Sequence, residues 1–531
     1  MLKTVDAFAT PQKMLALLTG SLLLFGPGAM PVHAGPVSGA TKTPIQHLVI
    51  VFQENVSFDH YFGTYPNAAN LPGETPFHAK PGTPTVNGFT PALLNQNPNL
   101  NPLNGAGAGN PFRLSPGQAV TADQDHDYTA EQKAFDKGLL DLFPLNVGTA
   151  GPPPAGGGIT STKSLNMGYF DGNTVAAMWN YAQKYAMNDN HFSTTFGPST
   201  PGAINLISGQ TNGVTLTKNG TGDEVDGGAG SLTVIGDPDP IGDVCSNPTR
   251  NQVQMGGKNI GDLLNAAGVT WGSFIGGFDL STVNSNGTTG CKRSSKGLAG
   301  TTGDYIPHHA WFQYYASTAN PSHTRPGSVN EIGFGGPANH EYDLADFFTA
   351  VQAHHFPAVS YIKAQAYQDG HAGYSDPIDE QNFLVSLINF LKQQPEWEST
   401  AVVIMYDDSD GWYDHQMGPI VNQSMGPADA LTGLNACGTA ATALPGIDAA
   451  NAHALGRCGY GPRQPLLVVS PWAKENFVDH TLTDLTSVLR FIEDNWLDGQ
   501  RIGQGSFDAL AGPIDGMFDF TSEHDRPDLD K

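Results

Sequence analysis

The stretch AVVIMYDDSDGWYDH, residues 401–415, carries the strongest fold signal in this 531-residue chain. Its first six residues are apolar or aromatic, and Asp407 and Asp408 follow them at once. A short, continuous apolar run of this kind is typical of a central strand in a parallel sheet, because such a strand is buried on both faces. Ligands of α/β proteins collect beyond the carboxyl ends of such strands. Residues 401–415 therefore predict a buried strand that ends in a functional site.

Similar apolar runs occur elsewhere in the chain and alternate with segments of helical periodicity. The predicted strands are residues 45–52, 269–275, 358–363, 401–406 and 465–470. The predicted helices are residues 174–187, 381–394 and 486–496. Strands that alternate with helices favour an α/β sandwich built on a mostly parallel sheet.

The N-terminal 34 residues have the pattern of a Sec-type signal peptide. Lys3 and Lys13 flank the start of an apolar run at 14–25, and the small-residue site Val32-His33-Ala34 follows it. The run is too short to span a bilayer, and no later stretch is apolar enough to do so. We therefore expect cleavage near Ala34 and a secreted or periplasmic product without a stable membrane anchor.

The mature chain is predicted to hold one catalytic domain, residues 35–500, followed by a C-terminal tail, residues 501–531. Its Gly-, Pro- and Asn-rich stretches are predicted to be long loop insertions. These insertions lie at about residues 64–121, 148–163, 211–258 and 277–303.

The chain has four cysteines, an even count that predicts two disulfides in an exported protein. Three pairings are possible. Sequence order favours Cys245–Cys291 together with Cys437–Cys458, because each pair would close a loop-rich stretch. No pair has the spacing of zinc ligands, so we expect these cysteines to be structural.

Acidic residues outnumber basic ones by 50 to 25, which gives a formal net charge of −25. A chain of this charge is repelled by nucleic acids and by anionic membrane surfaces, so we expect no nucleic-acid partner. A bound metal ion would offset the charge locally.

Two strand ends supply oxygen ligands for a divalent cation. The strand at 45–52 runs into Glu54 and Asn55, and the strand at 401–406 runs into Asp407 and Asp408. Adjacent carboxylates repel each other unless a cation lies between them. An Asp at a helix N-cap is the alternative, although Gly411 favours a tight turn. Four oxygen ligands suit Ca, Mg or Mn, and a histidine ligand would admit Zn or Fe.

A nucleophile candidate lies in the stretch FGPSTPG, residues 196–202. Pro201 suits the first turn of a helix, which places Ser199 just before the helix N-terminus, where free backbone N–H groups bind phosphate. A metal bound to the Ser199 hydroxyl would favour its alkoxide form. The alternative is an ordinary helix cap.

Three histidines lie in turn-like segments. His308 and His309 precede a run of aromatic residues, and His371 is flanked by glycines. Their imidazoles could donate to phosphate oxygens, bind a metal or protonate a leaving alkoxide.

Taken in order, these segments resemble the bacterial phosphoesterase family of phospholipase C and related secreted acid phosphatases, within the alkaline-phosphatase-like superfamily. The resemblance runs from about residue 43 to 496. It rests on Glu54-Asn55 and the following SFDHYFG, on Gly197-Pro198-Ser199, on the histidine segments, on the stretch around His126 and on Asp407-Asp408. The chain departs from the family at Val56, where members usually have Arg, and at Asp408, where Glu is frequent.

The resemblance implies a three-layer α/β/α sandwich and a phosphoserine intermediate. Ser199 takes the role of nucleophile and of a ligand that bridges to the metal. The other metal ligands are Glu54, Asn55, Asp407 and Asp408. His308, His309 and His371 take phosphate-binding or proton-transfer roles.

The main expectation is a secreted, metal-dependent phosphoesterase of the acid-phosphatase type, since the phospholipase branch generally has Thr where this chain has Ser199. The alternative is a phosphodiesterase of the phosphatidylcholine phospholipase C type. Trp311, Tyr314 and Tyr315 could cage a quaternary ammonium, or could belong to the core. A non-catalytic, acidic cation-binding surface protein is a further alternative, but it leaves Ser199 and the neighbouring histidine segments unexplained.

Overall fold

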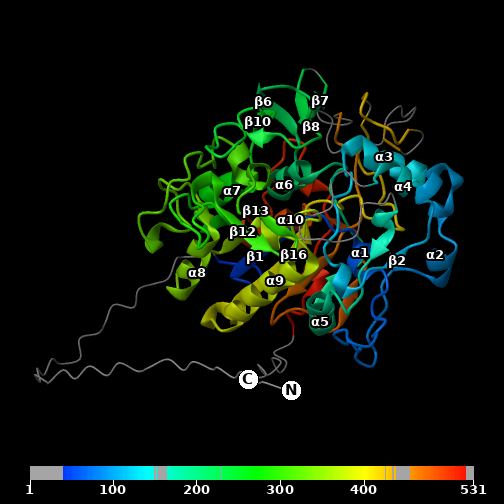
Figure 1. Ribbon diagram of the computed structural model, residues 1–531. Coiled ribbons are helices and arrows are strands. Elements are labelled where there is room, and N and C mark those ends of the chain that lie inside the picture. The colour runs from blue at the N-terminus through cyan, green and yellow to red at the C-terminus, as the bar shows by residue number, and fades with distance from the viewer. Residues whose placement is uncertain are drawn as a thin grey trace, which may run out of the picture. The chain divides into compact units, whose positions relative to one another are not determined.

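A central eight-stranded sheet organises the computed structural model (Figure 1). The structure describes residues 40–148, 151, 164–228, 230–424, 426–432, 436–437 and 455–521. The strand order is β14-β11-β15-β1-β16-β17-β4-β18. The bounds, in chain order, are β1 (His47–Gln53), β4 (Ala186–Asn188), β11 (Trp271–Ile275), β14 (Glu341–Asp343), β15 (Val359–Lys363), β16 (Thr400–Tyr406), β17 (Leu466–Val469) and β18 (Phe477–Asp479). The expected signal peptide at residues 1–34 lies outside the described residues.

The sheet is mostly parallel, as the sequence predicts. Strands β14, β11, β15, β1 and β16 pair in parallel. β17 is antiparallel to both β16 and β4, whereas β18 pairs with β4 in parallel. Each of the five strands predicted from apolar runs is present within two residues of its predicted ends.

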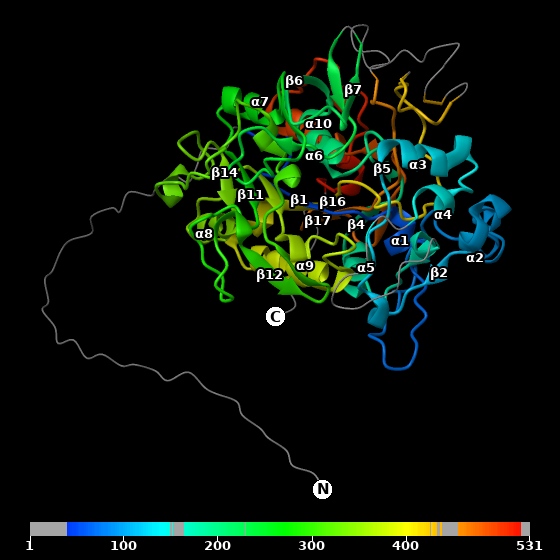
Figure 2. The same cartoon turned by 45° about the horizontal axis from the view of Figure 1, so that its top comes forward.

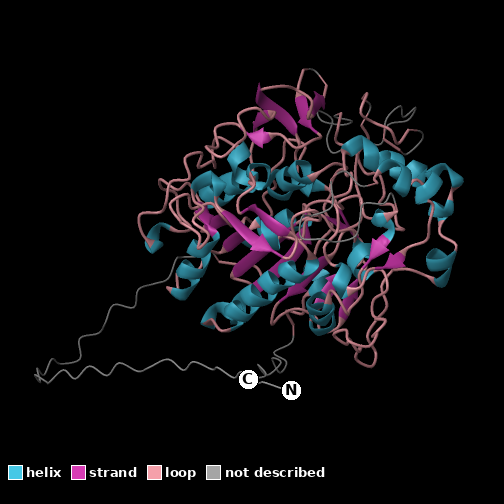
Figure 3. Ribbon diagram, viewed as in Figure 1, coloured by secondary structure: helices cyan, strands magenta, loops and turns pink. Residues whose placement is uncertain are grey.

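Helices cover both faces of the sheet, so the chain is a three-layer α/β/α sandwich (Figure 3). One layer contains α5 (Ala176–Lys184), α8 (Leu344–Gln352) and α9 (Pro377–Lys392), and the opposite layer contains α6 (Ser199–Ser208), α7 (Ile260–Ala267) and α10 (Ser487–Trp496). Side chains of a strand point alternately to its two faces. Leu48 and Ile50 of β1 accordingly pack with the α6 layer, and Val49 and Val51 pack with the α5 layer.

Shorter elements surround the sandwich. The remaining α-helices are α1 (Phe58–Phe62), α2 (Pro91–Asn95), α3 (Tyr128–Phe135) and α4 (Phe143–Asn146). Two-residue strands form two small pairs, β2 (Phe112–Arg113) with β3 (Gly168–Tyr169) and β5 (His191–Phe192) with β19 (Thr483–Asp484). Ile502, Ile514 and Met517, which the sequence places in a tail, are buried in the core of the α6 layer.

Two of the predicted loop insertions contain sheets, so their prediction as loops was wrong. Residues 212–255 form a five-stranded sheet, labelled at the top of Figure 2 by β6 and β7. Its strands are β6 (Asn212–Lys218), β7 (Glu224–Asp226), β8 (Leu232–Val234), β9 (Asp239–Pro240) and β10 (Gln252–Met255). In the second insertion, β12 (Ser294–Gly297) and β13 (Gly300–Gly303) form a hairpin. These strands are short and polar, and therefore lack the apolar runs that marked the central sheet.

Disulfides join the cysteines in the order that the sequence favours, Cys245 with Cys291 and Cys437 with Cys458. The first disulfide ties the insertion that carries the five-stranded sheet to the insertion that carries the hairpin. The predicted helix at 174–187 is too long, because α5 ends at Lys184 and Ala186 and Met187 belong to β4. Most of the predicted loop at 148–163 lies outside the described residues.

Candidate active site

The carboxyl ends of β1 and β16 bring four predicted ligands together. The two strands pair in parallel with Gln53 opposite Tyr406, so the residues that follow each strand are neighbours. The Asn55 backbone N–H donates to Asp407 Oδ1 at 2.9 Å. The side chains of all four predicted ligands, Glu54, Asn55, Asp407 and Asp408, are buried.

Ser199 lies directly against these acids, although its chain segment is far from both in the sequence. Its Oγ is 3.2 Å from Glu54 Oε2 and 3.1 Å from Asp408 Oδ2. The helix that carries it can approach β16 this closely because of Gly202. A Cβ at Gly202 would lie 2.5 Å from the Asp407 carbonyl oxygen. The structure therefore brings the hydroxyl of Ser199 next to the acids at 54 and 408.

The helix terminus differs from the prediction in two respects. Ser199 is the first residue of α6 and does not precede it. The Thr200 N–H, expected to be free for phosphate, donates to Asp237 Oδ1 at 2.8 Å. An acidic side chain thus already satisfies this donor at the helix N-terminus, where a negative charge is favourable.

Two buried oxygens in the ligand set have no hydrogen-bond partner among the described residues. They are Asn55 Oδ1 and Asp407 Oδ2. A buried polar atom without a partner is costly, and it calls for a water, an ion or a functional explanation. Oxygen atoms of this kind are the ligands that hard divalent cations prefer. The residues present therefore fit a metal ion.

The charge balance of the cluster also calls for a cation. Burial raises the pKa of Glu54 well above its ordinary value; the Asp407 carboxylate adds to this rise, and the Lys363 ammonium opposes it. Burial and Asp407 likewise raise the pKa of Asp408, against the effect of His126. Buried acids this close disfavour one another's ionised forms unless a positive charge compensates.

Lys363 supplies part of that charge, and sequence reasoning assigned it no role. It is the last residue of β15, and its ammonium pairs with Glu54 Oε1. Its side chain is only 3% exposed, so the ion pair is shielded from solvent. The available signal was a lysine at the end of an apolar strand, where a buried cation needs an acidic partner.

The three predicted histidines all lie at the site. His309 Nδ1 is 3.1 Å from Glu54 Oε1, and burial, followed by the charge of His308, lowers the pKa of His309 well below its ordinary value. His308 lies next to it and faces Asp239, with 3.7 Å between His308 Nδ1 and Asp239 Oδ1. His371 Nδ1 bonds the Ala372 carbonyl, which leaves Nε2 for a ligand.

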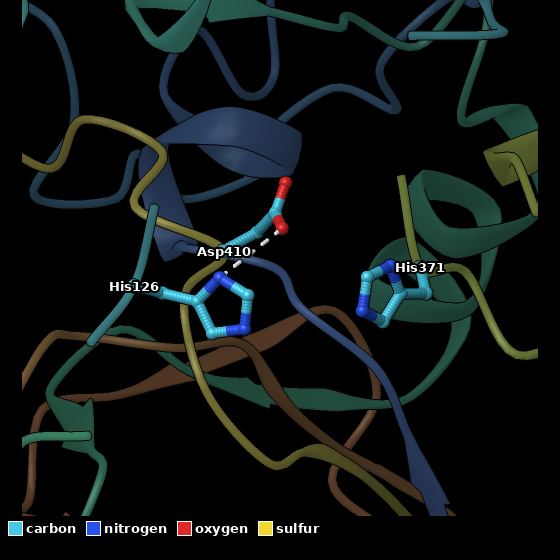
Figure 4. Close-up of side chains that lie close together, drawn as sticks. All are labelled: His126, His371 and Asp410. Carbon is cyan, nitrogen blue, oxygen red and sulfur yellow. Dashed lines mark ion pairs between the residues drawn. The ribbon is translucent and has the colours of Figure 1, made fainter. Parts of the chain in front are cut away.

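His126 and Asp410 complete the arrangement, and sequence reasoning assigned no role to either. His126 Nε2 is 3.9 Å from Asp408 Oδ2, and its Nδ1 is 3.6 Å from Asp410 Oδ1. Figure 4 shows the imidazoles of His126 and His371 on either side of a gap, with Asp410 beside His126. These three residues offer ligand atoms within 4.8 Å of one another. The only sequence signal was the stretch around His126 in the family resemblance.

A cavity of about 590 Å³ opens onto Ser199. All four histidines of the site line it, together with Asp123, Asp237 and Arg250. Trp311, Tyr314 and Tyr315 are fully buried and are not among its lining residues. These three aromatic residues belong to the core, so they do not cage a quaternary ammonium.

A serine, three carboxylates, one amide and four histidines meet at the carboxyl edge of a mostly parallel sheet, which is the arrangement expected of an α/β phosphoesterase. The chain belongs to the Phosphoesterase family, whose model matches residues 45–497. This match confirms the resemblance inferred from the sequence. Among the described residues, no helix has the length and apolar character needed to cross a bilayer.

Curated relatives are phospholipases C. A non-hemolytic phospholipase C of Burkholderia pseudomallei is 25% identical over 513 residues, which cover 94% of this chain and 63% of the relative. A non-hemolytic phospholipase C of Pseudomonas aeruginosa is 26% identical, with 91% and 58% covered. Phospholipase C B of Mycobacterium tuberculosis is 24% identical, with 94% and 82% covered. The chain thus spans less than two thirds of the first two relatives.

Among solved structures, a protein in the alkaline phosphatase superfamily from Vibrio parahaemolyticus is similar over 78% of this chain and 76% of its own. The TM-score is 0.27, and the sequence identity is 10%.

Proposed function

We propose that this chain is a phosphoesterase of the phospholipase C type that cleaves phosphate esters with Ser199 as nucleophile. The observation that carries the proposal is the convergence of Ser199 Oγ with Glu54 and Asp408, at 3.2 and 3.1 Å, on the floor of a cavity lined by histidines. The names of the relatives favour phospholipid headgroup esters over the acid-phosphatase expectation. On the pattern of residues 1–34, we place the enzyme outside the cytoplasm after cleavage near Ala34.

Glu54, Asn55, Asp407 and Asp408 would hold a divalent metal ion next to Ser199. When bound, this ion would supply positive charge that favours the serine alkoxide and neutralises charge on the phosphate oxygens. The oxygen ligands suit Ca, Mg or Mn, and the nearby imidazoles admit Zn.

The nucleophilic step begins at the hydroxyl of Ser199. Asp408 Oδ2, 3.1 Å away, accepts the hydroxyl proton while Oγ attacks phosphorus. With a cation bound beside it, Asp408 would be ionised and able to accept this proton. A phosphorus–oxygen bond to Ser199 forms while the bond to the leaving alcohol breaks.

His126 is the proton donor to the leaving oxygen. Burial lowers the pKa of His126, but the carboxylates of Asp408 and Asp410 outweigh burial and raise it well above its ordinary value. These carboxylates favour the protonated ring, which can donate a proton to the leaving alkoxide. In the second half-reaction a water attacks phosphoserine, His126 takes a proton from that water, and Ser199 recovers its own from Asp408.

The covalent mechanism is tested by Ser199→Ala. Because the substitution removes only the nucleophilic oxygen, we expect turnover of p-nitrophenylphosphorylcholine and p-nitrophenyl phosphate to be abolished while the melting temperature is retained. Ser208→Ala on the same helix serves as control, and mass spectrometry of quenched wild-type enzyme should find phosphate on Ser199. A Ser199→Ala protein with ordinary activity refutes the proposal.

The metal requirement is tested by Asp407→Asn and by chelation. Loss of one carboxylate charge from a four-ligand site should weaken divalent-ion binding and lower kcat/KM by about 100-fold, in the range of lost electrostatic stabilisation. Calorimetric titration of the apo protein with Ca²⁺, Mn²⁺ and Zn²⁺ identifies the ion. If the wild-type protein binds the ion but hydrolyses no ester, the result supports the alternative of a non-catalytic cation-binding protein.

A further inference from the structure

One wall of the cavity is built from the two insertions that contain the additional sheets. Arg250 comes from the segment between β9 and β10, and Ala299, Gly300 and Thr301 come from the β12–β13 hairpin. The Cys245–Cys291 disulfide joins these two insertions. This wall comes from segments other than the strand ends that carry Glu54 and Asp407 and the helix α6 that carries Ser199.

The guanidinium of Arg250 contacts the protein through Nε and leaves its two terminal nitrogens available to a ligand. Its Nε donates to the Asp237 carbonyl at 2.7 Å and lies 3.6 Å from Asp239 Oδ1. Within the described part of the chain, its two terminal nitrogens make no hydrogen bond to protein, and the side chain is 38% exposed. The guanidinium therefore presents the fork that recognises carboxylate and phosphate oxygens.

The surroundings of Arg250 hold its guanidinium in the cavity that Ser199 also lines. Asp239 lies between two nitrogen-bearing side chains, 3.6 Å from Arg250 Nε and 3.7 Å from His308 Nδ1.

Arg250 is the one lysine or arginine among the described residues that line the cavity. Of the aromatic residues, Trp311, Tyr314 and Tyr315 are buried away from the cavity and Tyr374 lines it, so no cage of several aromatic rings surrounds a cation among its described lining residues. A fixed guanidinium attracts a second negative charge on a substrate and repels a headgroup cation. In a cavity that Asp123 and Asp237 also line, Arg250 is thus the basic side chain that an anionic group of the ligand would contact.

We propose that Arg250 is a specificity-determining residue that selects substrates with a second negative charge beside the scissile bond. This inference rests on the proposed phosphoesterase function and names its substrate class. The charge has two possible sources. It is either the second ionised oxygen of a phosphomonoester or a carboxylate on the headgroup of a diester.

Arg250→Gln tests the assignment with three substrates on the holoenzyme, namely p-nitrophenyl phosphate, phosphatidylserine and phosphatidylcholine. Loss of a charge-assisted hydrogen bond should lower kcat/KM for the doubly charged substrate, relative to phosphatidylcholine, by about tenfold to 100-fold. A fall confined to p-nitrophenyl phosphate identifies the phosphomonoester, and a fall confined to phosphatidylserine identifies the carboxylate. Arg250→Lys should restore part of the ratio.

Lys218→Gln is the matched control. Lys218 is an exposed residue of β6 in the same small sheet, and its substitution removes the same charge as Arg250→Gln. Equal losses on all three substrates, or no loss on any, overturn the assignment of Arg250. If the proposed function of Ser199 as nucleophile is itself wrong, the result is different, because Ser199→Ala would then retain activity on every substrate.

Discussion

Asn55 combines a backbone requirement and a side-chain requirement at one position. Its φ is 61°, in the left-handed region, and its Oδ1 is buried without a partner among the described residues. Asn enters this region more readily than other residues that carry a Cβ. Its amide oxygen can also ligate a hard cation. The sequence predicts the second property from the place of Asn55 after a strand, whereas the first follows only from the coordinates.

Two substitutions separate these requirements. Asn55→Gly keeps the backbone conformation and removes the oxygen, so we expect divalent-ion affinity to fall about tenfold to 100-fold. Asn55→Ala should lose the same affinity and, in addition, about 1 kcal/mol of stability, because a Cβ is strained at positive φ. Calorimetric titration and urea unfolding of the apo proteins measure both effects. A glycine variant that binds the ion like wild type would remove Asn55 from the ligand set.

Glu380 gives the fold a pH dependence outside the site. It accepts hydrogen bonds from Tyr61 at 2.7 Å and from Tyr406 at 2.6 Å. Burial raises the pKa of Glu380 from 4.5 to about 7, although both tyrosine hydroxyls favour the ionised form. A raised carboxyl pKa means that the contribution to stability is complete below pH 4.5 and is lost as pH rises through 7.

Glu380→Gln, which cannot ionise, should remove this dependence. At about 1.4 kcal/mol per pH unit, wild type should lose about 3 kcal/mol relative to the variant between pH 4.5 and 7. Urea unfolding of both proteins at pH 5 and pH 8 measures the difference. If the two curves shift in parallel with pH, Glu380 is not the group responsible.

At the scale of elements, the sequence predicts those whose pattern is local. Runs such as 401–406 are apolar because the strand is buried on both faces, and the pattern alone identifies β16. β4, β14 and β18 have three residues each, too few for any periodicity, and only their neighbours make them strands. The sheet at 212–255 escaped prediction because several of its residues are exposed and polar.

The Cys245–Cys291 disulfide is the element that should hold the cavity wall together. Its two cysteines are 46 residues apart. Closing a loop of that length stabilises the fold by up to about 4 kcal/mol in the chain-entropy model. The double variant Cys245→Ser/Cys291→Ser should therefore melt at lower temperature and lose part of its preference among the three substrates. Unchanged preference at a temperature where the variant is folded would show that Arg250 is held by its own insertion alone.

At the scale of the whole molecule, the site is predictable where topology forces contact. Parallel neighbours bring their carboxyl ends to one edge, so Glu54 and Asp407 could be placed together from two strand ends. His126 could not, because it follows no strand. Lys363 ends β15 and Asp410 follows β16, but the turn and the packing around them decide that their side chains face the site. Which of several polar residues near a strand end face inward depends on tertiary contacts that no local pattern records.

The net charge of −25 sets a long-range field that opposes the local action of Arg250. The field should slow encounter with anionic lipid surfaces, and salt should relieve it, since the Debye length falls from about 30 Å at 0.01 M to about 8 Å at 0.15 M. We expect kcat/KM for phosphatidylserine vesicles to rise about threefold or more over that range, with little change for phosphatidylcholine.

The selectivity loss in Arg250→Gln should persist at both salt concentrations, because a direct contact in a partly enclosed cavity is screened far less than a distant field. Rates of vesicle hydrolysis at 0.01 and 0.15 M salt, for wild type and Arg250→Gln, therefore separate the long-range effect of the net charge from the direct contact of Arg250. If salt abolishes the Arg250 effect, that residue acts as part of the surface field, and the cavity wall does not select the substrate through contact.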